Sequence, residues 1–444
     1  MVTESFQYHA EPDSEGLARR AWSDIQTCRE VYNHALTQAY HPAPDHNKPS
    51  YTTMQNKLPG WKHRWPKWGE MYSKCLQMAV RRIKNSETIL EELEKKGYGV
   101  GELKWKAPRE YRSITYNQSG FDVDSNTGRT DRAVVEFSKI GCFNLSYHRP
   151  LPEDGTVRQI HLKKQTHGEW TVSIVVEYDP EYPDKPAVED ILLKDCVGVD
   201  LGIQSFVHDS DGRAVGRLDL SDDRERLERE QRSLSRKRHG SNNWEQQRRR
   251  VAEIHQRLTD RKDDFKHKLA HFYTSEYDAV LLEDLDVRGM LEGNGNARNK
   301  WEVGWRDFIA VLEHHGEKNG CYVVEVEPEG TTKECAQCGV ESDKPLWVRT
   351  HSCPSCGYEV DRDRNAAFNV LSRGLQKLGV VHSEARMPSE PLCDSDGLRK
   401  SVSDFRTLVE TATTADTQTV SASRVVEAGS PYLREPPKAA SRQG

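Results

Sequence analysis

Hydrophobic residues recur at spacings of three or four in two stretches near the N-terminus. The first begins after Ser14 and includes Leu17 and Trp22, and the second runs from about Met71 to Leu93. This spacing predicts two amphipathic helices, the first with Ser14 as its N-cap. The stretch HPAPDHNKP between them contains three prolines and two histidines, which predicts a loop.

A period of two replaces the helical period from about residue 133. Segments 133–148 and 156–178 alternate apolar and polar residues, and the second contains His167-Gly168 at its middle. The alternation predicts strands, and the second segment predicts a hairpin that turns at His167-Gly168. The N-terminal third is therefore expected to be a β-rich, barrel-like domain (1–13 and 98–183) that carries a helical insertion (14–97).

Another order of elements begins near Lys194. The segment VGVDLGIQSFVHDSDGRAVGRL predicts three strands, the polar stretch 222–275 predicts helix, and DAVLLEDLDV and YVVEVEPEG predict further strands. The predicted order is three antiparallel strands, then a helix, then strands that alternate with helices. This is the element order of a ribonuclease-H-like α/β fold. Residues 383–444 are rich in Ser, Thr, Ala and Pro and poor in aromatic residues, so we expect a disordered tail.

Composition limits the class of protein. The 444 residues carry a formal net charge of −6, with 64 basic and 70 acidic side chains, so nucleic-acid binding would depend on local clusters of positive charge. The chain contains no run of 18 apolar residues and no basic-then-apolar N-terminal signal region. We therefore expect a soluble, cytoplasmic protein that does not associate with membranes.

Four of the ten cysteines predict a metal site. Cys335-Ala-Gln-Cys338 and Cys353-Pro-Ser-Cys356 form two C-x₂-C pairs separated by fourteen residues, and a glycine follows each pair. Two such pairs supply the four thiolates of a tetrahedral structural Zn²⁺ ion, with no open coordination position for catalysis. Structural cysteines without metal, or two redox pairs, are the alternatives.

Three acidic residues lie where core-forming segments begin or end. Asp200 ends the apolar run VGVD, Glu283 ends AVLLE, and Asp363 begins the helical pattern DRNAAFNVL. These positions could gather carboxylates at one sheet edge, where they would bind Mg²⁺ or Mn²⁺. Each acid could equally cap a turn or favour a helix dipole. VGVDLG also occurs in actin-like ATPases, but the second Asp-x-Gly-Gly turn of those proteins is absent.

The segments GVDLGIQSF, LLEDLDVRGM, the cysteine ribbon and DRDRNAAFNVL together resemble the TnpB family of transposon-encoded RNA-guided nucleases, over about residues 190–375. The resemblance implies a RuvC-like nuclease domain (190–330 and 359–382) with an inserted zinc ribbon (331–358) and a basic helical insertion (222–275). It also implies guide RNA and target DNA as partners. The implied catalytic and Mg²⁺-binding acids are Asp200, Glu283 and Asp363, and the implied zinc ligands are Cys335, Cys338, Cys353 and Cys356. Asp361, Asp284 and Asp286 are acidic neighbours without an assigned role.

Positive charge concentrates in residues 229–250, REQRSLSRKRHGSNNWEQQRRR. Helical phasing puts Arg232, Arg236 and either Lys237 or His239 near one face, which would supply phosphate contacts. A solvated helical surface is the alternative. The candidate nucleic-acid-binding residues are Arg232, Arg236, Lys237, Arg238, Arg248, Arg249 and Arg250. A second stretch, GWKHRWPKW at 60–68, has tryptophans at a spacing that favours a core face over base stacking.

The expected function is RNA-guided, divalent-metal-dependent cleavage of DNA phosphodiester bonds, encoded by a transposable element. A non-catalytic nucleic-acid-binding accessory protein of transposition is the alternative. Strand joining is expected from a separate transposase, because His314-His315 lack the His-hydrophobic-His spacing of single-strand transposases.

Overall fold

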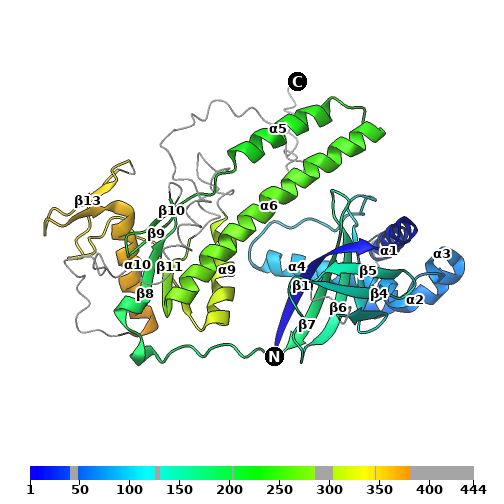
Figure 1. The fold of residues 1–444 in the computed structure, drawn as a ribbon, viewed down its shortest axis with the longest axis horizontal. Helices are drawn as coiled ribbons and strands as arrows, with labels where there is room; N and C mark the ends of the chain where they lie inside the picture. The colour runs from blue at the N-terminus through cyan, green and yellow to red at the C-terminus, as the bar shows by residue number, and fades with distance from the viewer. Residues whose placement is uncertain (41–48, 126–130, 203–204, 286–303, 346, 381–444) are drawn as a thin grey trace, which may run out of the picture. The chain divides into compact units, whose positions relative to one another are not determined.

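A computed structural model describes residues 1–40, 49–125, 131–202, 205–285, 304–345 and 347–380 (Figure 1). The chain divides into two compact units, and one of the boundaries between them falls within a long helix. The first unit comprises Met1–Tyr182 and Leu220–Arg261, and the second comprises Pro183–Asp219 and the described residues from Lys262 onward. The chain is thus a multidomain α/β protein, as predicted, whereas the exact domain boundaries stay predictions. The predicted tail 383–444 lies outside the described residues.

The first unit contains a seven-stranded antiparallel sheet with the order β2-β6-β7-β1-β5-β4-β3. Its strands are β1 (Val2–Pro12), β2 (Ser113–Asn117), β3 (Phe121–Asp124), β4 (Arg132–Phe137), β5 (Gly141–Ser146), β6 (Thr156–Lys164) and β7 (Trp170–Tyr178). Within the described residues, β2 and β3 end the order without pairing to each other, so the sheet is a half-barrel and not a closed barrel.

The predicted hairpin of residues 156–178 is confirmed as β6 and β7. Gly168 adopts a positive φ of 115° in the turn, which a residue without a Cβ atom allows. Along β7, Trp170, Val172, Ile174 and Val176 are buried and alternate with half-buried residues, so one face of the strand joins the core.

Helices α1 and α4 of the first unit pack against this sheet, and the unit contains further helices. The helices of the unit are α1 (Glu15–Tyr40), α2 (Tyr51–Arg64), α3 (Pro66–Gly69), α4 (Ser73–Lys95) and α5 (Ser221–Ser235), followed by α6 (Asn242–Glu276), which continues into the second unit. Ser14 Oγ accepts a hydrogen bond from Leu17 N, so the predicted N-cap of α1 is confirmed. Trp68 is buried, and Trp61 and Trp65 pack against the same core, which confirms the core interpretation of the tryptophans.

The second unit contains a mixed five-stranded sheet with the order β10-β9-β8-β11-β12. Its strands are β8 (Cys196–Asp200), β9 (Ser205–Asp209), β10 (Ala214–Gly216), β11 (Ala279–Glu283) and β12 (Tyr322–Val326). The first three strands pair antiparallel, whereas β8, β11 and β12 run parallel. The three predicted antiparallel strands are therefore confirmed, and so are the two later ones.

Helices cover both faces of this sheet (Figure 1). On one face, Val197, Val199, Val280 and Leu282 pack with α6 and α9 (Trp305–Asn319). On the other face, Cys196, Ala279 and Leu281 pack with α10 (Arg362–Leu378). Alternate residues of β8 and β11 thus pack into two separate cores, one on each face of the sheet. Because both faces are buried, these strands are continuous apolar runs in the sequence.

The segment between β12 and α10 forms a small ribbon with the two-stranded sheet β13 (Thr350–Ser352) and β14 (Glu359–Asp361). Two short 3₁₀ turns, Val188–Asp190 and Leu193–Asp195, precede β8. Among the described residues, no helix combines the length and the apolar character that crossing a bilayer requires.

Candidate functional site

The carboxyl ends of two neighbouring parallel strands bring Asp200 and Glu283 to the same sheet edge. β8 ends at Asp200 and β11 ends at Glu283, and the register pairs Leu282 with Val199. Both acids are almost fully buried, with 7% and 6% of their surface exposed. Two carboxylates 83 positions apart in sequence are therefore held beside each other by backbone pairing.

The first turn of α10 brings the third acid to this edge. α10 packs so closely on β8 that a Cβ atom at Gly198 would lie 2.1 Å from the carbonyl oxygen of Ala367. A residue without a side chain is thus required two positions before Asp200. Asp363 lies one helical turn before Ala367 and so reaches the end of β8.

Asp361 has a structural role at the same helix end. Its carboxylate accepts hydrogen bonds from the backbone N–H groups of Asp363 (2.8 Å) and Arg364 (3.3 Å), so it is the N-cap of α10. Asp284 is exposed and lies 3.9 Å from Arg306. Asp286 lies outside the described residues.

The charges of the other two acids act on Asp200. Burial raises the pKa of Asp200 well above its usual value, and the neighbouring charges of Glu283 and Asp363 raise it further. The guanidinium groups of Arg349 and Arg362 partly offset this rise. Glu283 and Asp363 therefore lie close enough to Asp200 for their charges to act on it.

Each of the other two acids has a specific polar partner. Burial raises the pKa of Glu283, and a hydrogen bond from the Thr331 hydroxyl to Glu283 Oε1 opposes that rise. Asp363 forms an ion pair with Arg349, which lies in the ribbon next to β13. Thr331 and Arg349 thus bring two parts of the segment between β12 and α10 into contact with the acids.

Carboxylate oxygens are the ligands that Mg²⁺ and Mn²⁺ prefer, and a buried cluster of acids needs positive charge. The three acids fit such ions by ligand type. Of the described residues, however, only the four ribbon cysteines bring at least three His, Cys, Asp or Glu ligand atoms within 4.8 Å of one another. The three acids do not form such a close group, and Asp363 is paired to Arg349.

The four cysteines Cys335, Cys338, Cys353 and Cys356 form one compact cluster. Sγ of Cys335 lies 3.7 Å from that of Cys356, and Sγ of Cys338 lies 3.5 Å from that of Cys353. A tetrahedral Zn²⁺ ion with Zn–S bonds of about 2.3 Å separates its sulfur ligands by roughly 3.8 Å. The cluster is therefore compatible with structural zinc.

The backbone around the cysteines supports this geometry. Gly339 and Gly357 both have a φ of 75°, and the N–H of each donates to the carbonyl of the first cysteine of its pair. Backbone N–H groups of Cys356 and Ser355 lower the pKa of Cys353 to about 6. Burial, in contrast, raises the pKa of Cys335 to about 12, so the four thiols differ in how readily they lose a proton.

The predicted nucleic-acid-binding residues lie on and between α5 and α6. Helix α5 ends at Ser235 with Arg236 as its C-cap, so the assumed helical phasing through Lys237 or His239 is wrong. Arg238 belongs to the turn between the helices, where Gly240 has a φ of 78°. The side chains of Arg232, Arg236, Arg238, Arg249 and Arg250 are exposed.

Two members of this set have protein partners. Arg232 pairs with Glu228 one turn earlier on the exposed surface of α5. Arg248 is 22% exposed, pairs with Glu245 and donates to the carbonyl of Thr166. Arg248 therefore contributes to packing within the first unit, whatever the other residues contact.

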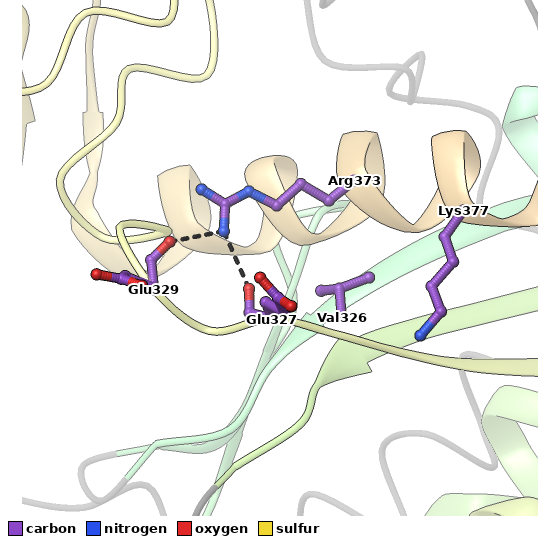
Figure 2. A pocket seen from close by; sticks show the side chains of 5 residues that line it. All are labelled: Val326, Glu327, Glu329, Arg373 and Lys377. Carbon is purple, nitrogen blue, oxygen red and sulfur yellow. Dashed lines mark hydrogen bonds between the residues drawn. The ribbon is translucent and has the colours of Figure 1, made fainter.

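A polar stripe on α10 contacts the loop 327–336, which leads from β12 to Cys335, the first of the four ribbon cysteines. The polar stripe consists of Asn365, Asn369 and Arg373, spaced four residues apart. Figure 2 shows a surface hollow at its end, lined by Val326, Glu327, Glu329, Arg373 and Lys377. Arg373 and Lys377 already donate to loop and strand carbonyls there, so the hollow belongs to the packing of the loop and does not contain the acids.

Sequence reasoning missed Thr331, Arg349 and the polar stripe. One signal was available: Asn365 and Asn369 alternate with Ala366, Ala367 and Val370 in the apolar face of a helix. A buried amide at such a position requires a partner.

Comparison with known proteins identifies the family. A model of the Cas12f1-like TNB domain matches residues 305–370, and a model described as a probable transposase matches residues 173–294. The chain is 32% identical over 133 residues to a TnpB-like protein of Methanocaldococcus jannaschii, which covers 28% of this chain and 46% of that protein. It is 31% identical over 383 residues to a putative RNA-guided DNA endonuclease of Streptomyces pristinaespiralis, which covers 84% of this chain and 90% of that protein. The chain belongs to the TnpB family.

Other members and neighbours agree with this TnpB assignment. The putative RNA-guided DNA endonuclease InsQ of Escherichia coli K12 is 26% identical over 390 residues, covering 82% of this chain and 91% of InsQ. The structure of the mini-RNA-guided endonuclease CRISPR-Cas_phi3 matches with a TM-score of 0.51 at 10% identity, covering 88% of this chain and 93% of that one. That likeness shows a shared fold.

Proposed function

We propose that this TnpB-family chain is an RNA-guided, divalent-metal-dependent DNA endonuclease with a RuvC-type site. The observation that carries the proposal is the meeting of Asp200, Glu283 and Asp363, from two strand ends and a helix start, with the pKa of Asp200 raised by burial and by the other two charges. The names of the relatives from Streptomyces and Escherichia coli support the activity and its RNA guide.

The five-stranded sheet supports the RuvC-type assignment. Its order, with three antiparallel strands followed by two parallel ones, is the ribonuclease-H-like order. Asp200, Glu283 and Asp363 would hold Mg²⁺ or Mn²⁺ through carboxylate oxygens. When bound, such ions activate water and offset the charge on the leaving oxygen of a phosphodiester.

The chain's own residues set the conditions for that chemistry. Burial of Asp200 and Glu283 keeps water from screening their charges, which strengthens the attraction for a cation. Cys335, Cys338, Cys353 and Cys356 would hold structural zinc and so fix the ribbon from which Arg349 reaches Asp363. The exposed arginines of residues 229–250 would contact nucleic-acid phosphates. A separate transposase would join the strands.

The test begins with the full-length protein purified from cells together with its RNA. Sequencing that RNA supplies the guide, and plasmid DNA containing the complementary target is then incubated with Mg²⁺. We expect guided cleavage that Asp200→Ala or Glu283→Ala abolishes while the RNA remains bound. Asp284→Ala, which removes an exposed neighbouring acid, is the matched control and should retain cleavage. Cleavage by the Asp200→Ala protein would reject the site, and bound RNA without any cleavage would favour a non-catalytic accessory protein.

A further inference from the structure

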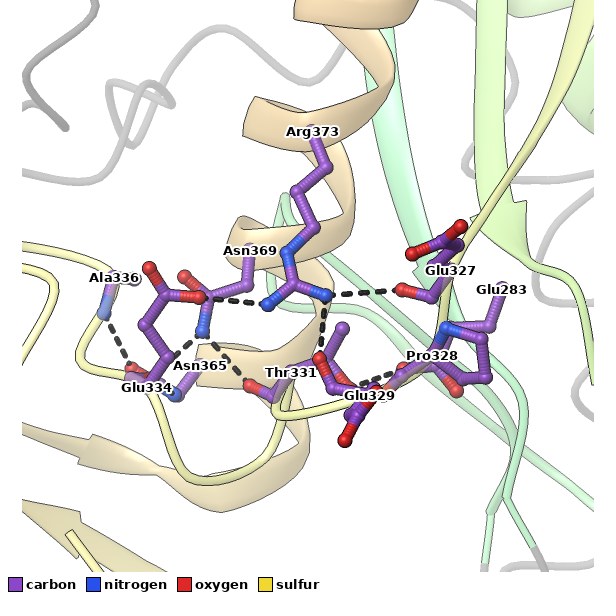
Figure 3. A network of polar contacts seen from close by, with 10 residues as sticks. All are labelled: Glu283, Glu327, Pro328, Glu329, Thr331, Glu334, Ala336, Asn365, Asn369 and Arg373. Atoms are coloured by element: carbon purple, nitrogen blue, oxygen red, sulfur yellow. Dashed lines mark hydrogen bonds and ion pairs between the residues drawn. The ribbon is translucent and has the colours of Figure 1, made fainter. Parts of the chain in front are cut away.

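The loop 327–336 is held in place by side chains of α10 along its whole length (Figure 3). Arg373 donates to the carbonyls of Glu327 (3.0 Å) and Glu329 (2.7 Å). Asn369 Nδ2 donates to the carbonyls of Thr331 and Glu334, both at 2.8 Å. The path of the loop is therefore set by the polar stripe.

The polar stripe also contacts the start of the ribbon that contains the four cysteines. Asn365 Nδ2 donates to the carbonyl of Glu334 (2.7 Å), and its Oδ1 accepts from the N–H of Ala336 (3.0 Å), which directly follows Cys335. Asn365 is fully buried and Asn369 is 5% exposed. Because a buried amide without partners is costly, these contacts fix the loop and the ribbon to the same helix that carries Asp363.

Thr331 lies at the middle of this loop and faces the acids. It is 2% exposed, and its hydroxyl donates to Glu283 Oε1. The carbonyl of Pro328 lies 3.1 Å from the same hydroxyl, but a carboxylate is the stronger acceptor. Asn369 holds the backbone carbonyl of Thr331 and burial confines its side chain, so its hydroxyl defines one orientation of the Glu283 carboxylate.

We infer that Thr331 is a positioning residue for Glu283, and that Asn369 acts on Glu283 through Thr331. This inference rests on the proposed function, in which Glu283 binds a divalent cation. Partners of metal-binding carboxylates orient the ligand before the ion arrives, so their loss weakens binding even though they do not touch the ion. The polar stripe thereby connects the ribbon and the acid site through α10.

The test measures Mn²⁺ binding to the full-length, zinc-loaded protein by electron paramagnetic resonance of the free ion. The Thr331→Val variant keeps the shape of the side chain and removes its hydroxyl. We expect its Mn²⁺ affinity to fall by about 10–100-fold, the usual cost of losing such a partner. Thr331→Ser, which restores a hydroxyl, should return the affinity to near that of the wild type. Thr332→Val is the matched neighbouring control and should leave the affinity unchanged.

A second variant tests the route through Asn369. Asn369→Ala removes the donor to the Thr331 carbonyl and should weaken Mn²⁺ binding in the same direction. Combining it with Thr331→Val should cost less than the sum of the two changes, because both act on the same carboxylate. Zinc content equal to that of the wild type confirms that each variant is folded. Unchanged Mn²⁺ affinity in a folded Thr331→Val or Asn369→Ala protein would overturn the inference.

The Asp200→Asn variant distinguishes a failure of the metal site from a failure of the positioning role of Thr331. One possible outcome is that the wild type binds Mn²⁺ and that Asp200→Asn abolishes this binding. If Thr331→Val then leaves the Mn²⁺ affinity unchanged, the positioning role is wrong and the acid site is still supported. If the wild type shows no Mn²⁺ binding that depends on Asp200, the metal site itself fails, and the positioning role fails with it. Weaker binding in Thr331→Val with recovery in Thr331→Ser supports both.

Discussion

Arg349 forms an ion pair with Asp363 across the boundary between the ribbon and α10. The backbone carbonyl of Arg349 also accepts a hydrogen bond from the N–H of Arg362, at 2.7 Å, so the cation is anchored beside the first turn of the helix. Its charge is one of two that lower the pKa of Asp200. A protein cation thus lies at the site where a metal cation is proposed to bind.

Removing this cation should make divalent ions bind more tightly. In Arg349→Ala, the Asp363 carboxylate has no competing ion pair, so we expect the Mn²⁺ dissociation constant to fall several-fold. Lys344→Ala is the control, because Lys344 belongs to the same ribbon but donates to the carbonyl of Ser352. Titration calorimetry of both variants checks the expectation, and an affinity equal to or weaker than that of the wild type would contradict it.

Neutralising Asp200 should stabilise the metal-free protein. Its pKa is raised in the folded state, so the folded protein binds more protons than the unfolded chain, and stability falls as pH rises from about 4 through the raised pKa. Asp200→Asn removes this cost at pH 7.5. We expect a higher Tm by a few degrees, since ~1 kcal/mol shifts Tm by roughly 2–4 °C in domains of this size.

Scanning calorimetry in buffer free of Mg²⁺ and Mn²⁺, with zinc retained, measures this effect. The difference between Asp200→Asn and the wild type should shrink at lower pH, where Asp200 is protonated, and after Mg²⁺ is added. Asp284→Asn is the exposed control and should leave Tm unchanged. A lower Tm for Asp200→Asn at pH 7.5 would show that the ionised carboxylate is not a source of instability.

Loss of one ribbon thiolate should remove zinc. Cys353→Ser deletes the ligand with the lowered pKa, and we expect zinc content to fall from about one ion per chain to near none. Because β13 and β14 are short, the ribbon should then lose its order, and Arg349 with it. Plasma mass spectrometry gives the zinc content. Cys142→Ser, at a separate cysteine in β5, should keep the ion; full zinc retention in Cys353→Ser would rule out the four-cysteine site.

His315 should make the second unit sensitive to acid. Burial, together with the facing charges of His267, His314, His271 and Lys318, lowers the pKa of His315 to about 4. Between that value and about 6.5, the unfolded chain binds more protons than the folded one, so stability increases with pH across this window. His315→Gln should flatten the dependence of Tm on pH between 4 and 6.5, and an unchanged slope would contradict the assignment.

Two exposed arginines should contribute to RNA binding without contributing to stability. Arg236 and Arg238 lie at the end of α5 and in the turn after it. Replacing one of them by Gln should weaken RNA binding and reduce the slope of log K against log salt by about one. Arg248→Gln should instead lower Tm, because it breaks the bonds to Glu245 and Thr166. Filter binding at several KCl concentrations distinguishes the two effects.

Local pattern was sufficient to predict much of this TnpB-family chain. The hairpin of residues 156–178, the strands that end at Asp200 and Glu283, and the N-cap at Ser14 all depend on neighbours a few positions away. The positions of Asp200 and Glu283 at the ends of two apolar strands belong to this local pattern. The helical phasing beyond Arg236 was wrong because the helix ends at Ser235, and the turn-forming run Gly240-Ser241-Asn242 was the signal of a break that the prediction did not use.

By itself, the sequence determined which residues form strands and helices, where the carboxylates and thiols stand along them, and to which family the segments are similar. Only the tertiary structure decided which of these groups meet. Thr331 reaches Glu283 across 48 positions, and Arg349 reaches Asp363 because β13 pairs with β14 directly before α10. Such pairs depend on the exact approach of one element to another, and the periodicity within each element contains no information about that distance.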